Sequence, residues 1–110
     1  MMKLIIAIVQ DEDSSRLIRS LMEEGYGATK LATTGGFLRS GNTTLLVGVE
    51  DDRFDGAMAV IEKICKSRKQ IATSPSPMSG STGVYVPYPI EVVVGGATIF
   101  VLNVEKFIKI

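Results

Sequence analysis

Residues 28–48 (ATKLATTGGFLRSGNTTLLVG) combine glycine, aromatic and amide residues in a spacing suited to binding a ligand. Glycines such as Gly36 allow backbone N–H groups to approach a guest closely, because glycine has no Cβ. Phe37 and Leu38 offer an apolar surface, and the side chain of Asn42 both donates and accepts hydrogen bonds. The stretch is therefore a candidate binding loop. The alternative is a hairpin loop in which glycine and asparagine serve the backbone turn alone.

An adenine nucleotide is the ligand that best suits this loop. The amide of Asn42 can pair with the N6/N7 edge of adenine, and the ring of Phe37 can stack on the base. Backbone N–H groups of the glycines, with Lys30 and Arg39 nearby, would attract phosphates. For either of these two cations taken alone, a solvated face is the favoured interpretation.

Residues 36–43 (GFLRSGNT) come close to the phosphate-binding loop pattern G-x-x-x-x-G-K-[ST]. Asn42 stands where that pattern needs the lysine that reaches the β- and γ-phosphates. Residues 44–49 are typical of a strand, so no helix N-terminus would face a phosphate here. These two departures exclude hydrolysis of a nucleoside triphosphate by this motif.

Length, charge and hydropathy exclude several classes of protein. The chain has 110 residues, so residues 1–110 are predicted to form a single domain. Twelve basic residues balance twelve acidic ones, which argues against a general nucleic-acid binder. The longest apolar run, residues 4–9, is too short to span a bilayer, and no signal-peptide pattern opens the chain. We therefore expect neither a nucleic-acid partner nor a membrane partner.

The content of cysteine and histidine limits the possible chemistry further. The chain has one cysteine, Cys65, and no histidine. An internal disulfide is thus impossible, and Ser–His and Cys–His nucleophile pairs are absent. A zinc or other soft-metal site would also lack its usual ligands. We expect a non-enzymatic cytoplasmic protein without a metal or a cofactor.

The spacing of apolar residues predicts the elements that position the loop. Residues 3–10 are apolar at both alternating positions, which predicts a strand that is central in its sheet or covered on both faces. Residues 11–14 (DEDS) predict the start of a helix whose dipole the carboxylates serve; a hard-cation site is the alternative. Gly25 is expected to end this helix. Its buried face would contain Leu17, Ile18, Leu21 and Met22.

Two strands and a second helix are expected next. The strands lie at about residues 27–34 and 43–49, with the binding loop between them. Asp51 and Asp52 are expected to cap the helix. Its buried stripe would contain Phe54, Ala57, Met58, Ile61, Ile64 and Cys65, and its solvated side Arg53, Glu62, Lys63 and Lys66. Cys65 is thus predicted to be a packed, inert thiol.

The last third of the chain changes in character. Residues 71–89 contain all four prolines, which predicts a long irregular loop that is either functional or a disordered insertion without consequence. Residues 90–94 and 97–104 are rich in β-branched side chains and are separated by Gly95 and Gly96. This pattern predicts a hairpin with a two-residue turn.

The expected elements run β-α-β-β-α and end with a loop and a hairpin. This order predicts an α+β, ferredoxin-like sandwich with an antiparallel sheet and both helices on one face. Because the strands are apolar at both alternating positions, identical subunits are expected to cover the open face of the sheet.

Three stretches, IIAIVQDED, ATKLATTGGFLRSGNTT and PYPIEVVVGGATIFVL, closely resemble the cyclic di-AMP receptor proteins of the PII-like signalling superfamily. The similarity covers essentially the whole chain. It implies a ferredoxin-like (PII-like) β-α-β-β-α-β sandwich, a homotrimer, and one cyclic dinucleotide in each cleft between adjacent subunits. Two extended loops, here at residues 34–44 and 71–89, would emerge near these clefts.

The resemblance also implies the residues of the site. Ala28 would lie close to the ligand, and Phe100, from the neighbouring subunit, would pack on the second base. Gly27 and Lys109 stand where some relatives have arginine and glutamine, so contacts from those two side chains are not carried over. The residues that would contact the ligand are Thr29, Gly36, Phe37, Leu38, Asn42 and Gly48.

The predicted function is a non-enzymatic receptor that binds cyclic di-AMP between the subunits of a homotrimer. The ligand would change the order of residues 71–89 and so present a different surface to an unidentified downstream protein. The alternative is an ATP or ADP sensor like the nitrogen-regulatory PII proteins, which respond to a mononucleotide together with 2-oxoglutarate. An enzyme is the third and least supported hypothesis.

Overall fold

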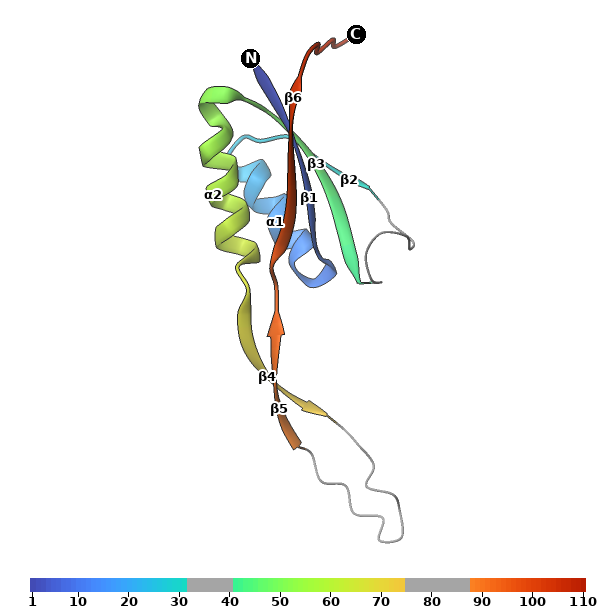
Figure 1. Ribbon diagram of the computed structural model, residues 1–110, viewed down its shortest axis with the longest axis vertical. Helices are drawn as coiled ribbons and strands as arrows, with labels where there is room; N and C mark the ends of the chain where they lie inside the picture. The colour runs from blue at the N-terminus through green and yellow to red at the C-terminus, as the bar shows by residue number, and fades with distance from the viewer. Residues whose placement is uncertain (32–40, 75–87) are drawn as a thin grey trace, which may run out of the picture.

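The computed structural model describes residues 1–31, 41–74 and 88–110, and these form a two-layer body from which a narrow arm extends (Figure 1). The body contains β1 (Met2–Gln10), α1 (Asp11–Glu23), β2 (Ala28–Leu31), β3 (Asn42–Glu50), the 3-10 turn η1 (Asp51–Arg53), α2 (Phe54–Cys65) and β6 (Ala97–Val104). The arm contains β4 (Arg68–Ser74) and β5 (Tyr88–Val94).

A four-stranded antiparallel sheet with the order β2-β3-β1-β6 forms one layer of the body. Strand β1 lies in the middle and pairs with β3 from Met2↔Glu50 to Gln10↔Asn42, and with β6 from Met2↔Val104 to Val9↔Ala97. This topology confirms the predicted ferredoxin-like fold, with β6 as the fourth strand of the sheet. It also confirms that the first strand is central.

Both helices cover the same face of this sheet. Along β1 the side chains of Ile5, Ala7 and Val9 are buried, whereas the residues between them remain partly exposed. Successive side chains of a strand point to opposite faces, so α1 and α2 cover one face, and the described residues leave the other face open. The rest of the core comes from Leu17 and Leu21 of α1, Leu45, Val47 and Val49 of β3, and Ala57, Ile61 and Cys65 of α2.

The predicted end of α1 is confirmed, and one predicted core residue is wrong. Gly25 has φ 85°, its N–H donates to Met22 O at 3.0 Å, and the N–H of Tyr26 donates to Leu21 O at 2.8 Å. This pair of bonds is a Schellman motif. The side chain of Met22, expected on the buried face, is 64% exposed, because it follows Leu21 by one residue and so lies about 100° further around the helix.

The acidic residues at the start of α1 do more than serve its dipole. Asp11, Glu12 and Asp13 lie in the first turn, while Gln10 occupies the N-cap position without a side-chain cap. Asp13 is only 1% exposed, and its Oδ1 lies 2.8 Å from Arg68 Nη2 and 3.2 Å from Arg16 Nη2. This carboxylate is therefore a buried ion-pair partner of the arm, which neither expected role included. Hydrogen bonding to Asp13 raises the pKa of Arg68 above its ordinary value.

Helix α2 has the predicted buried stripe but a different start. Asp51 and Asp52 form the first part of η1 and make no side-chain cap. Phe54, Met58 and Ile64 pack partly buried against the core, next to the buried Ala57, Ile61 and Cys65. Arg53 is exposed, as predicted; its Nη2 also donates to Glu24 O at 2.8 Å, and its guanidinium lies 4.3 Å from the centre of the Tyr26 ring. Arg53 thus joins the end of α1 to the start of α2.

Cys65 is packed as predicted, and its thiol is expected to resist alkylation. Burial raises its pKa from 9.0 to about 11, and the side chain is 1% exposed. At pH 8 this pKa lowers the thiolate fraction about 100-fold relative to the unfolded chain. We expect iodoacetamide to modify Cys65 at pH 8 only after denaturation, as measured by mass spectrometry. Rapid modification of the folded protein would contradict this prediction.

The arm corrects two predictions. Residues 71–74 and 88–89 were expected to be irregular, but they belong to β4 and β5, which pair from Arg68↔Val94 to Ser74↔Tyr88. The predicted hairpin across Gly95 and Gly96 is wrong, because β5 pairs with β4 while β6 pairs with β1. The two glycines, with φ of 86° and 87°, carry the chain from the arm into the body instead of reversing it (Figure 1). Residues 75–87 of the predicted loop lie outside the described residues.

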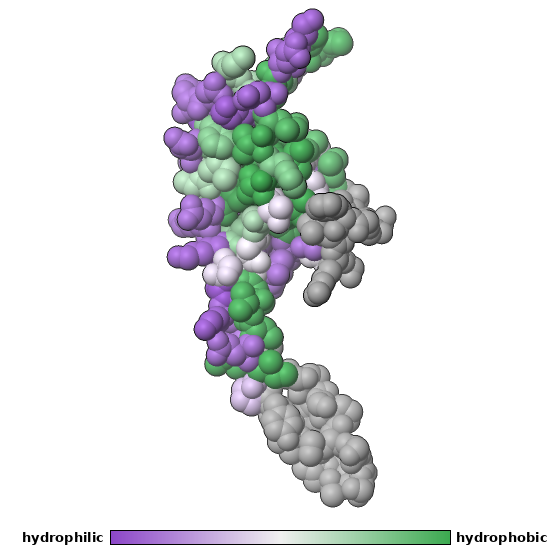
Figure 2. Space-filling view, viewed as in Figure 1, coloured by the Kyte–Doolittle hydropathy of each residue, from purple (hydrophilic) through white to green (hydrophobic). Residues whose placement is uncertain are grey.

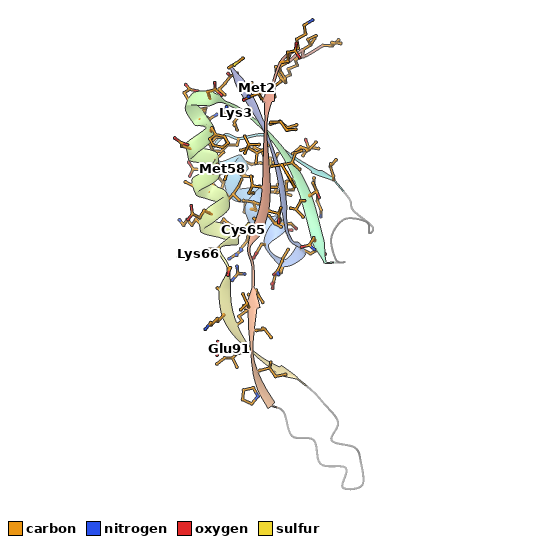
Figure 3. All side chains as sticks on the ribbon, viewed as in Figure 1. Met2, Lys3, Met58, Cys65, Lys66 and Glu91 are labelled. Carbon is orange, nitrogen blue, oxygen red and sulfur yellow. The ribbon has the colours of Figure 1, made fainter. Side chains whose placement is uncertain are left out.

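Polar contacts hold the base of the arm to the body. Lys66 lies where α2 passes into β4, and Glu91 lies further out on the arm (Figure 3). Arg68 Nη1 donates to Lys66 O at 3.2 Å, besides its ion pair with Asp13. On the second strand, the Gly95 N–H donates to Gln10 Oε1 at 2.8 Å, and the Gly96 N–H donates to Cys65 O. Both strands of the arm are therefore attached to the body where they leave it.

Candidate ligand-binding site

Four of the predicted site residues share the open face of the sheet. Thr29 pairs with Leu46, Asn42 with Gln10, Gly48 with Leu4, and Phe100 with Ile6. Residues that pair directly across a sheet lie on the same face, and the partners on β1 alternate with the buried Ile5, Ala7 and Val9. All four site residues therefore lie opposite the helices.

The remaining predicted residues do not extend this set. Ala28 pairs with the fully buried Val47 and packs partly buried against the core, so its side chain belongs to the helix-covered face. Lys30, expected to attract phosphates, pairs with the buried Leu45 and is likewise on the helix side, exposed at the edge strand β2. Gly36, Phe37, Leu38 and Arg39 lie outside the described residues.

A cavity of about 410 Å³ contains Asn42 and lies at one end of the open face. This volume is typical of small-molecule sites. The lining combines the amides of Gln10 and Asn42, the hydroxyl of Thr98 and the backbone of two glycines with apolar side chains. Its residues are Ile8, Gln10, Asn42, Gly95, Gly96, Ala97 and Thr98. An arrangement of this kind can accept a planar base on its apolar side and supply hydrogen bonds at its polar side.

The first turn of α1 fixes the position of Asn42. The Asp11 N–H donates to Gly41 O at 2.8 Å, and the Thr43 hydroxyl donates to Asp11 Oδ1. Thr43 is 5% exposed, so this contact is shielded from water. The residues on both sides of Asn42 are thus attached to one aspartate. The sequence reasoning assigned Asp11 to the helix dipole and missed this role, because it depends on residues 32 positions apart.

Away from the cavity, the open face of the single chain is apolar and accessible. Phe100 is 45% exposed and Leu102 is 50% exposed, and Leu4 and Ile6 are partly exposed beside them. Figure 2 shows hydrophobic residues gathered over the body around β6. A contiguous apolar surface of this kind marks an interaction site in a soluble protein.

A family model described as cyclic-di-AMP receptor matches residues 2–110 of this chain. The chain belongs to the cyclic-di-AMP receptor family. The resemblance seen in the sequence is therefore confirmed.

Solved structures that are similar to this chain include two that differ widely in sequence identity. A functionally unknown protein from Pediococcus pentosaceus ATCC 25745 has a TM-score of 0.80 and 41% identity, with coverage of 99% of this chain and 97% of that chain. Arabidopsis thaliana PII, in a crystal structure with citrate, has a TM-score of 0.64 and 17% identity, with coverage of 99% and 80%. At this low identity the plant protein shows the fold alone, which is PII-like.

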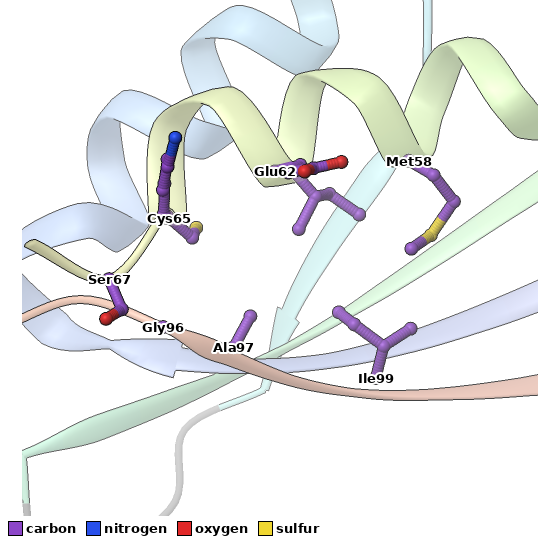
Figure 4. Close-up of a pocket in the computed structure, with 9 residues that line it drawn as sticks. Met58, Glu62, Cys65, Ser67, Gly96, Ala97 and Ile99 are labelled. Carbon is purple, nitrogen blue, oxygen red and sulfur yellow. The ribbon is translucent and has the colours of Figure 1, made fainter.

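A second cavity lies between α2 and β6 (Figure 4). Its volume is about 320 Å³, and Met58, Cys65, Ala97 and Ile99 supply much of its apolar lining. None of the predicted site residues within the described part of the chain lines it. Gly96 and Ala97, where β6 begins, contribute to both cavities. The open-face cavity therefore remains the candidate site, since Asn42, a predicted ligand-binding residue, lines it.

The residues that the structure describes contain neither a metal-binding group of side chains nor a membrane-spanning helix. Within residues 1–31, 41–74 and 88–110, no three histidine, cysteine, aspartate or glutamate side chains form a group suited to a metal ion. No helix in these ranges is long and apolar enough to cross a membrane.

Gln10 is the residue of the site that sequence reasoning missed. It ends β1, pairs with Asn42 in the sheet and lines the same cavity. Its only signal in the sequence was its place as a polar residue after an apolar strand, which many surface residues share.

Proposed function

We propose that this chain is a non-enzymatic receptor that binds cyclic di-AMP in the clefts between the subunits of a homotrimer. The family supports cyclic di-AMP as the ligand. The observation that carries the proposal is the common placement of Thr29, Asn42, Gly48 and Phe100 on the open, apolar face. Copies of the chain that cover this face would enclose these residues between them.

The ligand is held by three kinds of contact. The amide of Asn42 bonds the edge of one adenine, and Phe37 stacks on a base. Backbone N–H groups near Gly36 bind the phosphates, with Leu38, Thr29 and Gly48 in contact and the backbone of Ala28 close by. Phe100 of the neighbouring subunit packs on the second base. Its partial exposure in the single chain leaves it accessible for this contact.

The signal is then passed on through the arm. Residues 1–110 act as one domain in the cytoplasm, and no cofactor takes part. Binding changes the order of the loop between β4 and β5, and this change is read by a downstream protein. The polar contacts at the base of the arm support this route, because they join both arm strands to the body beside the cavity.

Calorimetric titration with cyclic di-AMP, ATP and ADP tests the proposal, together with light scattering for the mass of the assembly. We expect one cyclic dinucleotide per chain, a trimeric mass, and preference for cyclic di-AMP over both mononucleotides. A monomer that releases no heat and shows no shift in Tm with cyclic di-AMP would overturn the proposal. Preference for ATP or ADP would instead indicate a PII-type mononucleotide sensor.

A further inference from the structure

Gln10 lies between the candidate site and the base of the arm. Its backbone pairs with Asn42, and its side chain lines the cavity of about 410 Å³ that also contains Asn42. Its Oε1 accepts a hydrogen bond of 2.8 Å from the N–H of Gly95, which is the residue after β5. One side chain therefore contacts both the cavity and the end of the arm.

The two ends of the Gln10 amide can each make one of these contacts, because its oxygen accepts hydrogen bonds and its nitrogen donates them. The bond from Gly95 must end on the oxygen, because an amide nitrogen cannot accept the N–H proton; this identifies the oxygen and nitrogen ends of the Gln10 side chain. The Nε2 group carries two donors, and it makes no hydrogen bond to any residue in the described part of the chain. No buried side-chain nitrogen or oxygen in that part lacks a partner, so Nε2 is accessible. It is available to an acceptor atom of a ligand.

A small displacement of Gly95 would also displace the arm, because Gly95 lies next to both of its strands. The next N–H, of Gly96, donates to Cys65 O, so the chain is held on both sides of the junction. A Cβ on Gly95 would lie 2.7 Å from Lys66 O and 2.7 Å from Arg68 Nη1. Since β4 begins at Arg68, Gly95 packs against the start of one arm strand and follows the end of the other.

We propose that Gln10 is a ligand-contacting residue that also couples the site to the arm. Its Nε2 donates to an acceptor of the nucleotide bound beside Asn42, either a ring nitrogen or a phosphate oxygen. Its Oε1 holds the Gly95 N–H more firmly when the amide is fixed in this way, because hydrogen bonds in a chain polarise one another. This inference rests on the proposed function and adds a residue and a route of regulation to it.

Two substitutions separate the two halves of the amide. Gln10→Glu keeps an oxygen that accepts the Gly95 N–H but removes the donors and adds a negative charge. Gln10→Leu removes both. Gln70→Glu, an exposed residue of β4 that pairs with Val92, is the matched control for the added charge. Affinity is measured by calorimetry with cyclic di-AMP, and the hydrogen exchange of the Gly95 amide is measured by NMR with and without the ligand.

For the unmodified protein we expect cyclic di-AMP to slow exchange of the Gly95 amide about tenfold or more. Gln10→Glu should preserve the protection of Gly95 in the free protein and lower the affinity at least about tenfold. Gln10→Leu should lower both the affinity and the protection of Gly95. Gln70→Glu should behave as the unmodified protein.

The failure of this inference is distinct from the failure of the proposed function. If the unmodified protein binds cyclic di-AMP and both Gln10 variants bind it equally well, the role of Gln10 is wrong while the receptor stands. If the Gly95 amide exchanges at the same rate with and without bound ligand, the coupling is wrong. If the unmodified protein does not bind cyclic di-AMP, the proposed function fails and this inference fails with it.

Discussion

Gly95→Ala is expected to destabilise the protein by about 2–5 kcal/mol. Gly95 has φ 86°, where a residue with a Cβ costs about 1–2 kcal/mol. The added methyl group would also lie 2.7 Å from Lys66 O and 3.0 Å from Cys65 O. These are backbone atoms at the end of α2, so they cannot move aside as a flexible side chain does, and overpacking of this kind costs about 1–3 kcal/mol more.

Gly96→Ala is the matched control for this change. Gly96 has φ 87°, but no other atom of the described residues lies within 4 Å of the position its Cβ would take. It should therefore lose only the conformational part, about 1–2 kcal/mol. Urea unfolding monitored by circular dichroism gives both values. Equal losses for the two variants would show that the close approach of Gly95 to α2 has no energetic weight.

The second large effect concerns ligand binding. Asn42→Ala is expected to weaken the affinity for cyclic di-AMP about 5- to 150-fold, which corresponds to about 1–3 kcal/mol for a bidentate amide–adenine pair. The variant should also lose discrimination against cyclic di-GMP, because the amide reads the donor and acceptor pattern of the base. Calorimetric titration with both cyclic dinucleotides measures the two quantities.

Asn103→Ala controls for the loss of an amide elsewhere on the sheet. Asn103 is exposed on β6, pairs with Lys3 and accepts a 3.0 Å hydrogen bond from Lys3 Nζ, so it lies outside the predicted site. Its replacement should leave the affinity unchanged. If Asn42→Ala binds as tightly as the Asn103 variant, Asn42 does not read the base and its assigned role is wrong.

Features that depend on residues close together in the sequence, such as the end of a helix and its buried stripe, were predicted correctly. The Schellman motif at Gly25 depends on a glycine at the end of an apolar helical pattern, and the pattern predicts it directly. The buried stripe of α2 follows from its 3.6-residue period in the same way. The central position of β1 was predicted from its apolar residues at both alternating positions: one set is buried under the helices, and the other forms the open apolar face.

The candidate site could be predicted only in part. Asn42 stood out because its amide can pair with the edge of an adenine. The resemblance of the sequence to a known family then added Thr29, Gly48 and Phe100 to the predicted site. The structure added that these four share one face, whereas the side chains of Ala28 and Lys30 belong to the other. The face on which a side chain lies depends on the register between the strands. A shift of that register by one residue would place the side chain on the opposite face.

The sequence by itself determined the family, the order of the body elements and the residue types of the site. Only the tertiary structure decided that β5 joins β4 rather than β6, and that Asp13, Gln10 and Gly95 meet at the base of the arm. Gly95 and Gly96 are compatible with a hairpin, but the free edge of β1 offers β6 a pairing over its whole length. This pairing joins residues 88 to 102 positions apart in the sequence. The free energy of such a contact therefore leaves no pattern in any short stretch of the chain.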